Sequence, residues 1–128
     1  NQWWKKKNID RYKDAIISFS GLDKYINTPV KRYSSGMIVK LGFSVATILD
    51  SDIILVDEVL AVADQEFREK ALKKMQEISN DKLKTILFVS HNMDMIKTFC
   101  EECIVLDNGE LKFQGNTNKA IDFYTNRK

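Results

Sequence analysis

The chain has 128 residues, of which 44% are hydrophobic, and its 20 Lys and Arg against 18 Asp and Glu give a formal net charge of +2. This length suits one compact domain with a real core. The balanced charge does not favour binding to nucleic acid, so no nucleic-acid partner is expected. No apolar run reaches the roughly 18 residues of a membrane span.

The first half of the chain is expected to be helical. Apolar residues recur at helical spacing in residues 9–19, and Gly21 can end that helix. A second helix is expected over residues 34–49 after a short link that contains Pro29, the only proline. This second helix is apolar nearly all round, which predicts that it is buried.

Strands and a helix alternate in the next part of the chain. Two short apolar runs, residues 53–56 and 85–89, predict strands of a parallel sheet that is covered on both faces. The helix expected between them, residues 65–79, has an inner stripe of Phe67, Ala71, Met75 and Ile78, and Asp64 is its expected N-cap. The strand-helix-strand order predicts an α/β fold with parallel strands.

The last part is expected to hold a short helix (92–100), a hairpin that turns at Asn108-Gly109, and a final helix (117–125). Cys100 and Cys103 form a C-x-x-C pair. The pair ends a helix instead of beginning one, and it is short of the four ligands of a structural zinc site. We expect two reduced cysteines that act as small apolar residues.

Polar residues follow both expected strands. Asp57 and Glu58 come after the first strand, and Ser90 and His91 come after the second. In parallel sheets, ligands gather at the carboxyl ends of the strands. A first carboxylate can hold magnesium through water, a second can activate a water molecule, and a histidine can bond a phosphate. Each feature taken alone also fits an ordinary polar loop.

Small hydroxyl residues precede the expected helix 34–49. At Ser34-Ser35-Gly36, backbone N–H groups and two hydroxyls can approach an anion, and a helix N-terminus favours negative charge. An ordinary serine N-cap is the alternative at Ser34.

Taken in order, these segments resemble the second half of an ABC-transporter ATPase domain. The matching segments are Tyr33-Ser34-Ser35-Gly36-Met37, Ile53-Ile54-Leu55-Val56-Asp57-Glu58, Ala61-Val62-Ala63-Asp64 and Ser90-His91, which stand for the signature motif, the Walker B strand, the D-loop and the switch histidine. The resemblance covers nearly all of residues 9–128.

The signature departs from the usual Leu-Ser-Gly-Gly-Gln at Tyr33, Ser35 and Met37. This variant, followed by Val59-Leu60-Ala61-Val62 and by a terminal Ile121-Asp122-Phe123-Tyr124, is similar to the ATPases that export capsular polysaccharide, O-antigen or teichoic acid. The expected function is therefore ATP-driven export of a cell-surface glycan.

The resemblance implies a P-loop NTPase-like parallel sheet with flanking helices, present in part. Residues 1–49 would be part of the helical signature subdomain, and residues 50–128 the C-terminal part of the ATP-hydrolysing core. It also implies a head-to-tail dimer of two ATPase subunits at the cytoplasmic face of the membrane, joined to a transmembrane permease.

The cofactors implied by the resemblance are ATP and Mg2+. Asp57 would lie near the magnesium, Glu58 would be the general base, His91 would touch the γ-phosphate, and Asp64 would cross the dimer interface. The segment that would contact ATP on the opposite subunit is Tyr33, Ser34, Ser35, Gly36 and Met37.

No G-x-x-x-x-G-K-[ST] phosphate loop occurs in the chain, and its first residue is Asn1. A truncated domain that is inactive alone is therefore expected. Trp3 and Trp4 beside three lysines suggest a membrane interface or a partner surface, and the alternative is a truncated segment whose packing partner is missing. Two alternatives stay open. One is a non-catalytic interaction module. The other is an ABC ATPase of DNA repair or chromosome structure. Such ATPases usually carry long coiled coils, and the sequence contains no sustained heptads that would support this alternative.

Overall fold

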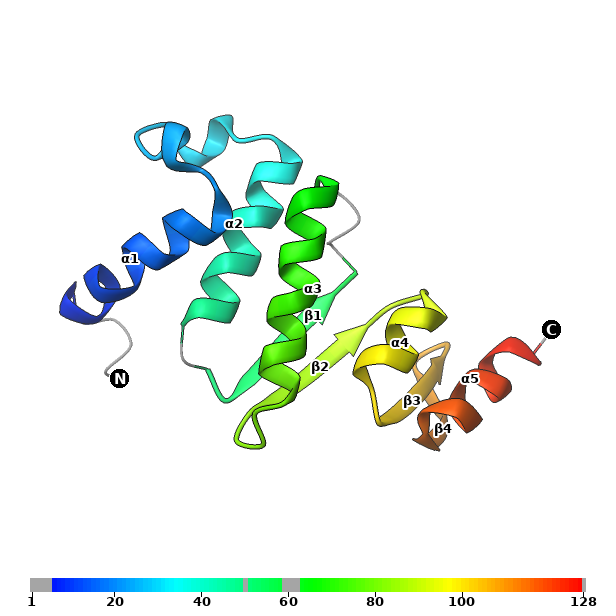
Figure 1. Ribbon diagram of the computed structural model, residues 1–128. Helices are drawn as coiled ribbons and strands as arrows, with labels where there is room; N and C mark the ends of the chain where they lie inside the picture. Colours follow the sequence, from blue (N-terminus) through cyan, green and yellow to red (C-terminus); the bar gives the residue numbers. More distant parts are fainter. Residues whose placement is uncertain (1–5, 50, 59–62, 128) are drawn as a thin grey trace. The chain divides into compact units, whose positions relative to one another are not determined.

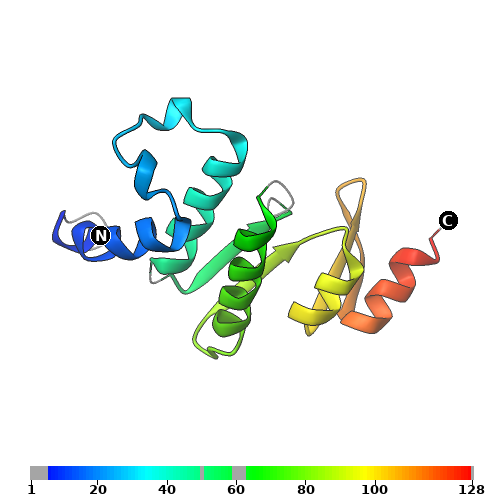
Figure 2. The same ribbon diagram turned by 45° about the horizontal axis from the view of Figure 1, so that its top comes forward.

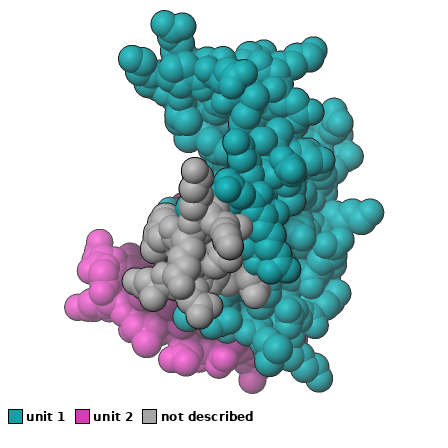
Figure 3. Space-filling model, turned by 90° about the vertical axis from the view of Figure 1, so that its left-hand side faces the viewer, with its two compact units in different colours: residues 1–87 teal, residues 88–128 magenta. Residues whose placement is uncertain are grey.

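The computed structural model describes residues 6–49, 51–58 and 63–127. Trp3, Trp4 and the stretch Val59-Leu60-Ala61-Val62, which includes half of the expected D-loop, lie outside the described residues. The chain forms two compact units, Asn1–Leu87 and Phe88–Lys128, which Figure 3 distinguishes by colour. The division expected between residues 49 and 50 follows subdomains of the family and remains a prediction.

The elements follow the expected order (Figure 1). The first unit contains α1 (Lys6–Ser20), two 3-10 turns, η2 (Asp23–Tyr25) and η3 (Val30–Arg32), then α2 (Ser35–Ile48), β1 (Ile53–Asp57) and α3 (Gln65–Ser79). The strand β2 (Thr85–Val89) leads to α4 (Met93–Phe99), β3 (Glu102–Asp107), β4 (Glu110–Asn116) and α5 (Thr117–Thr125). No helix in these described ranges has the length and apolarity needed to cross a bilayer.

The end of α1 is confirmed at Gly21. Gly21 has φ 68°, a conformation that glycine adopts without strain, and its N–H donates to the Ile17 carbonyl at 3.1 Å. The buried Ser20 hydroxyl donates to the same carbonyl at 3.0 Å, so the polar group that closes the helix is satisfied. The chain then leaves α1 toward η2.

Three aromatic side chains join the helices of the first unit. Phe19 of α1, Phe43 of α2 and Phe67 of α3 lie with ring centroids 5.8–6.2 Å apart. Phe67 meets both partners edge to face, which is a favoured geometry for aromatic rings. The predicted inner stripe of α3 is confirmed, because all four of its residues are buried.

The prediction that α2 is buried all round is wrong. Its buried residues are Phe43, Ser44 and Thr47, whereas Ile38 is 49% exposed. Among the described residues, α2 packs against α1 and α3, and these contacts leave part of the helix exposed. The two buried hydroxyls donate to carbonyls one turn earlier, which satisfies them.

The strands β1 and β2 are hydrogen-bonded neighbours and run in the same direction (Figure 1), as expected. The prediction that both faces are covered is wrong. In β1, Ile54 and Val56 are buried, but Ile53 is 70% exposed and Leu55 is 64% exposed. In both ribbon views α3 lies over one face of this pair (Figure 2), and the alternation of β1 follows from that one-sided cover.

The predicted hairpin is confirmed as β3 and β4, paired antiparallel. Asn108 (φ 49°) and Gly109 (φ 76°) form the turn, and positive φ at both positions matches the right-handed twist of the strands. The helix α5 packs on both strands, and Ala120 and Ile121 of α5 and Val105 of β3 are buried. Beyond α5, Arg127 forms an ion pair with Asp107 at 2.6 Å.

Candidate functional site

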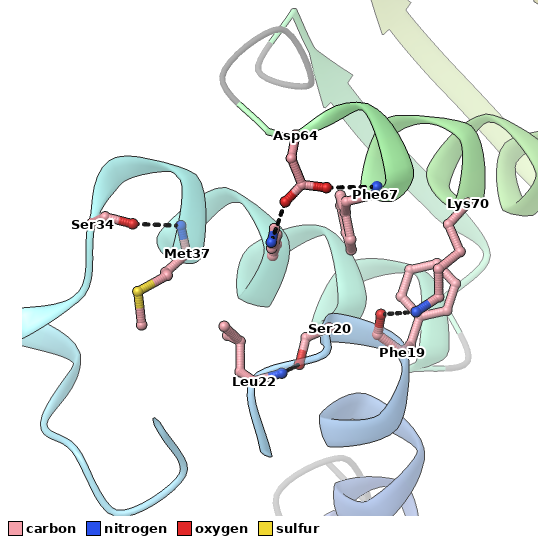
Figure 4. A network of polar contacts seen from close by, with 9 residues as sticks. Phe19, Ser20, Leu22, Ser34, Met37, Asp64, Phe67 and Lys70 are labelled. Carbon is pink, nitrogen blue, oxygen red and sulfur yellow. Dashed lines mark hydrogen bonds and ion pairs between the residues drawn. The ribbon is translucent and has the colours of Figure 1, made fainter. Parts of the chain in front are cut away.

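Residues 33–37, called the signature segment from here on, lead into the N-terminus of α2. The Ser34 Oγ accepts a hydrogen bond from the Met37 N–H at 3.2 Å (Figure 4). The serine N-cap considered for Ser34 is therefore confirmed. Ser35, the first residue of the helix, is exposed together with Ser34. The segment thus presents two hydroxyls at a helix N-terminus, where the helix dipole attracts an anion.

Tyr33 holds the start of the segment in place. Its hydroxyl donates at 2.8 Å to the carbonyl of Tyr25, the last residue of η2, across the link that contains η3. The usual leucine of the signature could not make this bond, because it has no donor. Tyrosine at this position therefore fixes the start of the segment by a hydrogen bond within its own chain.

Asp64 caps α3 and also pairs with a side chain of α2. Its Oδ1 accepts from the Phe67 N–H at 2.9 Å (Figure 4), which confirms the predicted N-cap. Its Oδ2 forms an ion pair with the Nζ of Lys40. The bond from Lys40, followed by the Phe67 N–H, lowers the pKa of Asp64 below its ordinary value.

Asp57 is the last residue of β1, and Glu58 follows it. Both are exposed. Asp57 falls on the same alternating face as the exposed Ile53 and Leu55. Two exposed carboxylates therefore follow one another at the end of the strand.

The donor chemistry at the end of β1 fits magnesium held in part by other groups. No group of three or more His, Cys, Asp or Glu that could hold a metal occurs among the described residues. Magnesium in phosphoryl-transfer sites needs only one or two carboxylates, because phosphates and water supply the other oxygens. An exposed Asp57 is compatible with that kind of site.

His91 lies in a tight turn of the second unit. The Ser90 Oγ accepts from the Asn92 N–H at 2.9 Å, so the turn closes around His91. The Asn92 side chain then caps α4 by accepting from the Asp94 and Met95 N–H groups. Nδ1 of His91 lies 3.4 Å from the Tyr124 hydroxyl of α5. The Ser90-Asn92 turn thus restrains the backbone of His91, and the Tyr124 hydroxyl contacts its ring.

Sequence reasoning missed Lys40 and the hydroxyl of Tyr124. Lys40 is the only charged residue in residues 34–49, and a lone charge in an apolar helix needs a partner. That signal could have identified Lys40. Nothing in the sequence pattern indicates that Tyr124 reaches His91, because the two residues are 33 positions apart.

The two cysteines are both free and half-buried, as expected. Cys103 donates to the Thr117 hydroxyl at 3.4 Å, and that hydroxyl donates to the Cys100 carbonyl at 2.6 Å. Burial, with the nearby Cys103 as a second cause, raises the pKa of the Cys100 thiol to about 11. Such a thiol is a poor nucleophile at neutral pH, which fits a packing role.

Comparison with known proteins finds similar sequences over almost the whole chain. No protein-family model matches the chain. It is 42% identical over 121 residues to the teichoic acids export ATP-binding protein TagH of Staphylococcus epidermidis, which is 94% of this chain and 46% of that protein. It is 40% identical over 120 residues to the O-antigen export system ATP-binding protein RfbB of Klebsiella pneumoniae, with coverages of 94% and 48%.

Two solved structures share the fold of this chain. One is an ATP binding subunit of an ABC transporter, with TM-score 0.76, 19% identity and coverage of 97% of this chain and 51% of that chain. Another is cbiO1 of Clostridium perfringens, part of the ABC transporter complex cbiONQ, with TM-score 0.61, 19% identity and coverages of 92% and 47%. The chain is a homologue of ABC ATP-binding subunits. Their fold confirms the predicted α/β class, with a parallel sheet and flanking helices.

The match covers only part of each ABC ATP-binding subunit. The chain spans less than half the length of the TagH and RfbB relatives, and only 22% of the TagH protein of Bacillus cereus, to which it is 40% identical over 119 residues. The reaction, the substrate and the partners of the whole protein are therefore taken up as proposals.

Proposed function

We propose that the whole protein is the ATP-hydrolysing subunit of a transporter that exports a cell-surface polysaccharide or related glycan. The observation that supports this most directly is the identity of 40–42% to teichoic acid and O-antigen export ATP-binding proteins. The signature segment leads into α2, the acidic pair stands at the end of β1, and the Ser90-His91 turn follows β2, as the proposed role of each requires.

The proposed chemistry is attack of water on the γ-phosphate of ATP. Glu58, which follows the last residue of β1, acts as the general base that orients the water and takes its proton. His91 donates to the γ-phosphate, and the Ser90-Asn92 turn limits the movement of its backbone. Positioning and charge stabilisation account for most of the catalysis of phosphoryl transfer, so fixed donors matter more than covalent chemistry.

Asp57 is the residue that would hold Mg2+. When bound, the ion would neutralise charge that develops on the phosphates. Asp57 is suited to this by its exposed carboxylate, which leaves room for a water shell.

The proposed partners are a second ATPase subunit and a transmembrane permease at the cytoplasmic face of the membrane. In a head-to-tail dimer, Ser34, Ser35 and Gly36 of one subunit approach the γ-phosphate bound to the other. The exposed hydroxyls at the N-terminus of α2 support this role, because a phosphate there gains N–H donors and the helix dipole.

The test uses the full-length protein in which the rest of the ATPase domain is present. Glu58→Gln is expected to lower kcat by at least about a hundredfold, because a general base commonly contributes that much, while ATP binding is retained. Glu77→Gln, an exposed carboxylate on α3, is the matched control and should keep kcat within about twofold. Near-normal turnover of Glu58→Gln would remove Glu58 from the proposed role.

A non-catalytic interaction module is the second candidate for residues 1–128 taken alone. The observation in its favour is that this sequence contains no phosphate-loop motif. An ATP titration of the 128-residue chain by calorimetry decides the point. Weak or absent binding is expected, and micromolar binding would contradict this candidate.

A further inference from the structure

Lys40 connects the helix of the signature segment with the start of α3. It lies four residues after Gly36, one helical turn into α2, and its Nζ pairs with the Asp64 carboxylate. Lys40 is the more enclosed partner, with a side chain 24% exposed against 52% for Asp64. The ion pair therefore joins the N-terminal end of α3 to the first turns of α2, beside the signature segment.

Phe67 contacts both members of the ion pair, so that Lys40, Asp64 and Phe67 each contact the other two. Its N–H donates to Asp64, and the Lys40 ammonium lies 6.0 Å from the centroid of its ring. The Phe67 ring also packs edge to face against Phe43, which lies one turn beyond Lys40 on α2. Each of the three residues thus limits the movement of the other two. The lowered pKa of Asp64 agrees with a carboxylate that is held in its charged form.

Stability alone gives little reason for a lysine at this point. Exposed ion pairs contribute little to the free energy of unfolding, and a lysine on an otherwise apolar helix loses conformational freedom when it is held. The aromatic contacts already join α2 to α3. What the ion pair adds is a fixed relationship between the N-termini of these two helices, which are the parts that bear Ser34-Ser35-Gly36 and Asp64.

We propose that Lys40 is a positioning residue, whose ion pair holds the signature segment and Asp64 in one spatial relationship so that both meet the opposite subunit together. This inference rests on the proposed function, because it assumes that these two segments face a second ATPase subunit. It assigns to Lys40 no contact with ATP. Its effect passes through Asp64 and through the first turn of α2.

The kinetic test compares three variants of the full-length protein. Lys40→Met removes the charge and keeps most of the stem, and it is expected to lower kcat about tenfold with KM for ATP within about twofold, as misplacement of reacting groups does. Lys40→Arg keeps the charge and should stay within about threefold of the wild type.

Lys70→Met is the matched control. Lys70 lies on α3, donates to the Phe19 carbonyl at 2.6 Å (Figure 4) and lies 4.9 Å from the centroid of the Phe19 ring, so it also joins two helices of the first unit. It touches neither the signature segment nor Asp64. Its loss should leave kcat within about twofold. Equal losses in Lys40→Met and Lys70→Met would indicate general loosening and would overturn the inference.

Amide hydrogen exchange provides a readout that does not need turnover. In Lys40→Met the Met37 and Phe67 amides, which the two N-caps protect, should both exchange at least about fivefold faster, and Lys40→Arg should restore both. Unchanged exchange at both amides overturns the inference, and so does faster exchange with unchanged kcat. If the wild-type protein hydrolyses no ATP, the proposed function fails, and with it the catalytic part of the inference. The exchange data then decide separately whether Lys40 links the two helix N-termini.

Discussion

The Tyr124 hydroxyl lies 3.4 Å from Nδ1 of His91, although the two residues are 33 positions apart in the sequence. The contact joins α5 to the turn that follows β2. A partner at one ring nitrogen of a histidine restrains the ring and favours one tautomer. The last helix of the chain thus supports the residue that is proposed to touch the γ-phosphate.

Tyr124→Phe removes this hydroxyl and keeps the ring. In the full-length protein, kcat should fall roughly two- to tenfold, which corresponds to the net contribution of one hydrogen bond. Two-bond 1H–15N spectra should show a shift in the tautomer populations of His91. Tyr25→Phe, which alters an exposed tyrosine on η2, is the control and should change neither quantity. An unaltered His91 spectrum would show that the hydroxyl does not restrain the ring.

Asp64 is expected to titrate below the ordinary pKa of an aspartate. The bonds from Lys40 and Phe67 favour the carboxylate, so its contribution to stability is complete above the ordinary value and is lost as the pH falls through the lowered one. Titration of the Asp64 carboxyl carbon by 13C NMR measures this pKa. Lys40→Met should raise it toward the ordinary value, whereas Lys40→Arg should not. Identical titration curves for all three proteins would exclude the ion pair in solution.

Phe67 is expected to be the most sensitive of the three aromatic residues that join the first unit. Phe67→Ala removes two edge-to-face contacts in a buried position, and should cost about 3–5 kcal/mol of the free energy of unfolding. Urea denaturation followed by circular dichroism measures the loss. Leu83→Ala, at a position that is 87% exposed, is the control and should change the stability by less than about 0.5 kcal/mol.

Cys100 is expected to resist alkylation near neutral pH. Because burial raises its pKa to about 11, only a very small fraction of the thiol is ionised at pH 7.5, and its rate with iodoacetamide should keep rising as the pH is raised past 9. Mass spectrometry of timed samples follows the reaction at each cysteine. A rate that levels off below pH 9 would show that the thiol is not enclosed as the structure indicates.

Much of the fold could be predicted because it depends on local patterns. The stripe on α3 repeats at helical spacing, Asn108-Gly109 has the conformations that a two-residue turn needs, and Gly21 can adopt positive φ. Each of these signals lies within a few residues of the structure that it specifies. The N-caps at Ser34 and Asp64 were predictable for the same reason.

The faces of α2 and β1 could not be predicted from hydrophobicity alone. An apolar side chain such as Ile38 or Leu55 shows a preference for burial, but the packing of other elements decides whether cover is present. The partners of Lys40 and His91 depend on chain folding over 24 and 33 positions, which no local period records. The roles of Glu58 and the signature segment came from the order of motifs, and they stay predictions.

The exposed face of β1 has a consequence for work with the 128-residue chain at the bench. Ile53, Leu55 and Leu87 offer apolar surface to water, with exposures of 70%, 64% and 53%. Exposed apolar surface of this kind is prone to self-association, and salts such as ammonium sulfate strengthen the effect. We therefore expect light scattering to rise with protein concentration and with sulfate. Leu55→Thr, which keeps a strand-forming residue at this position, should improve the yield of monomer.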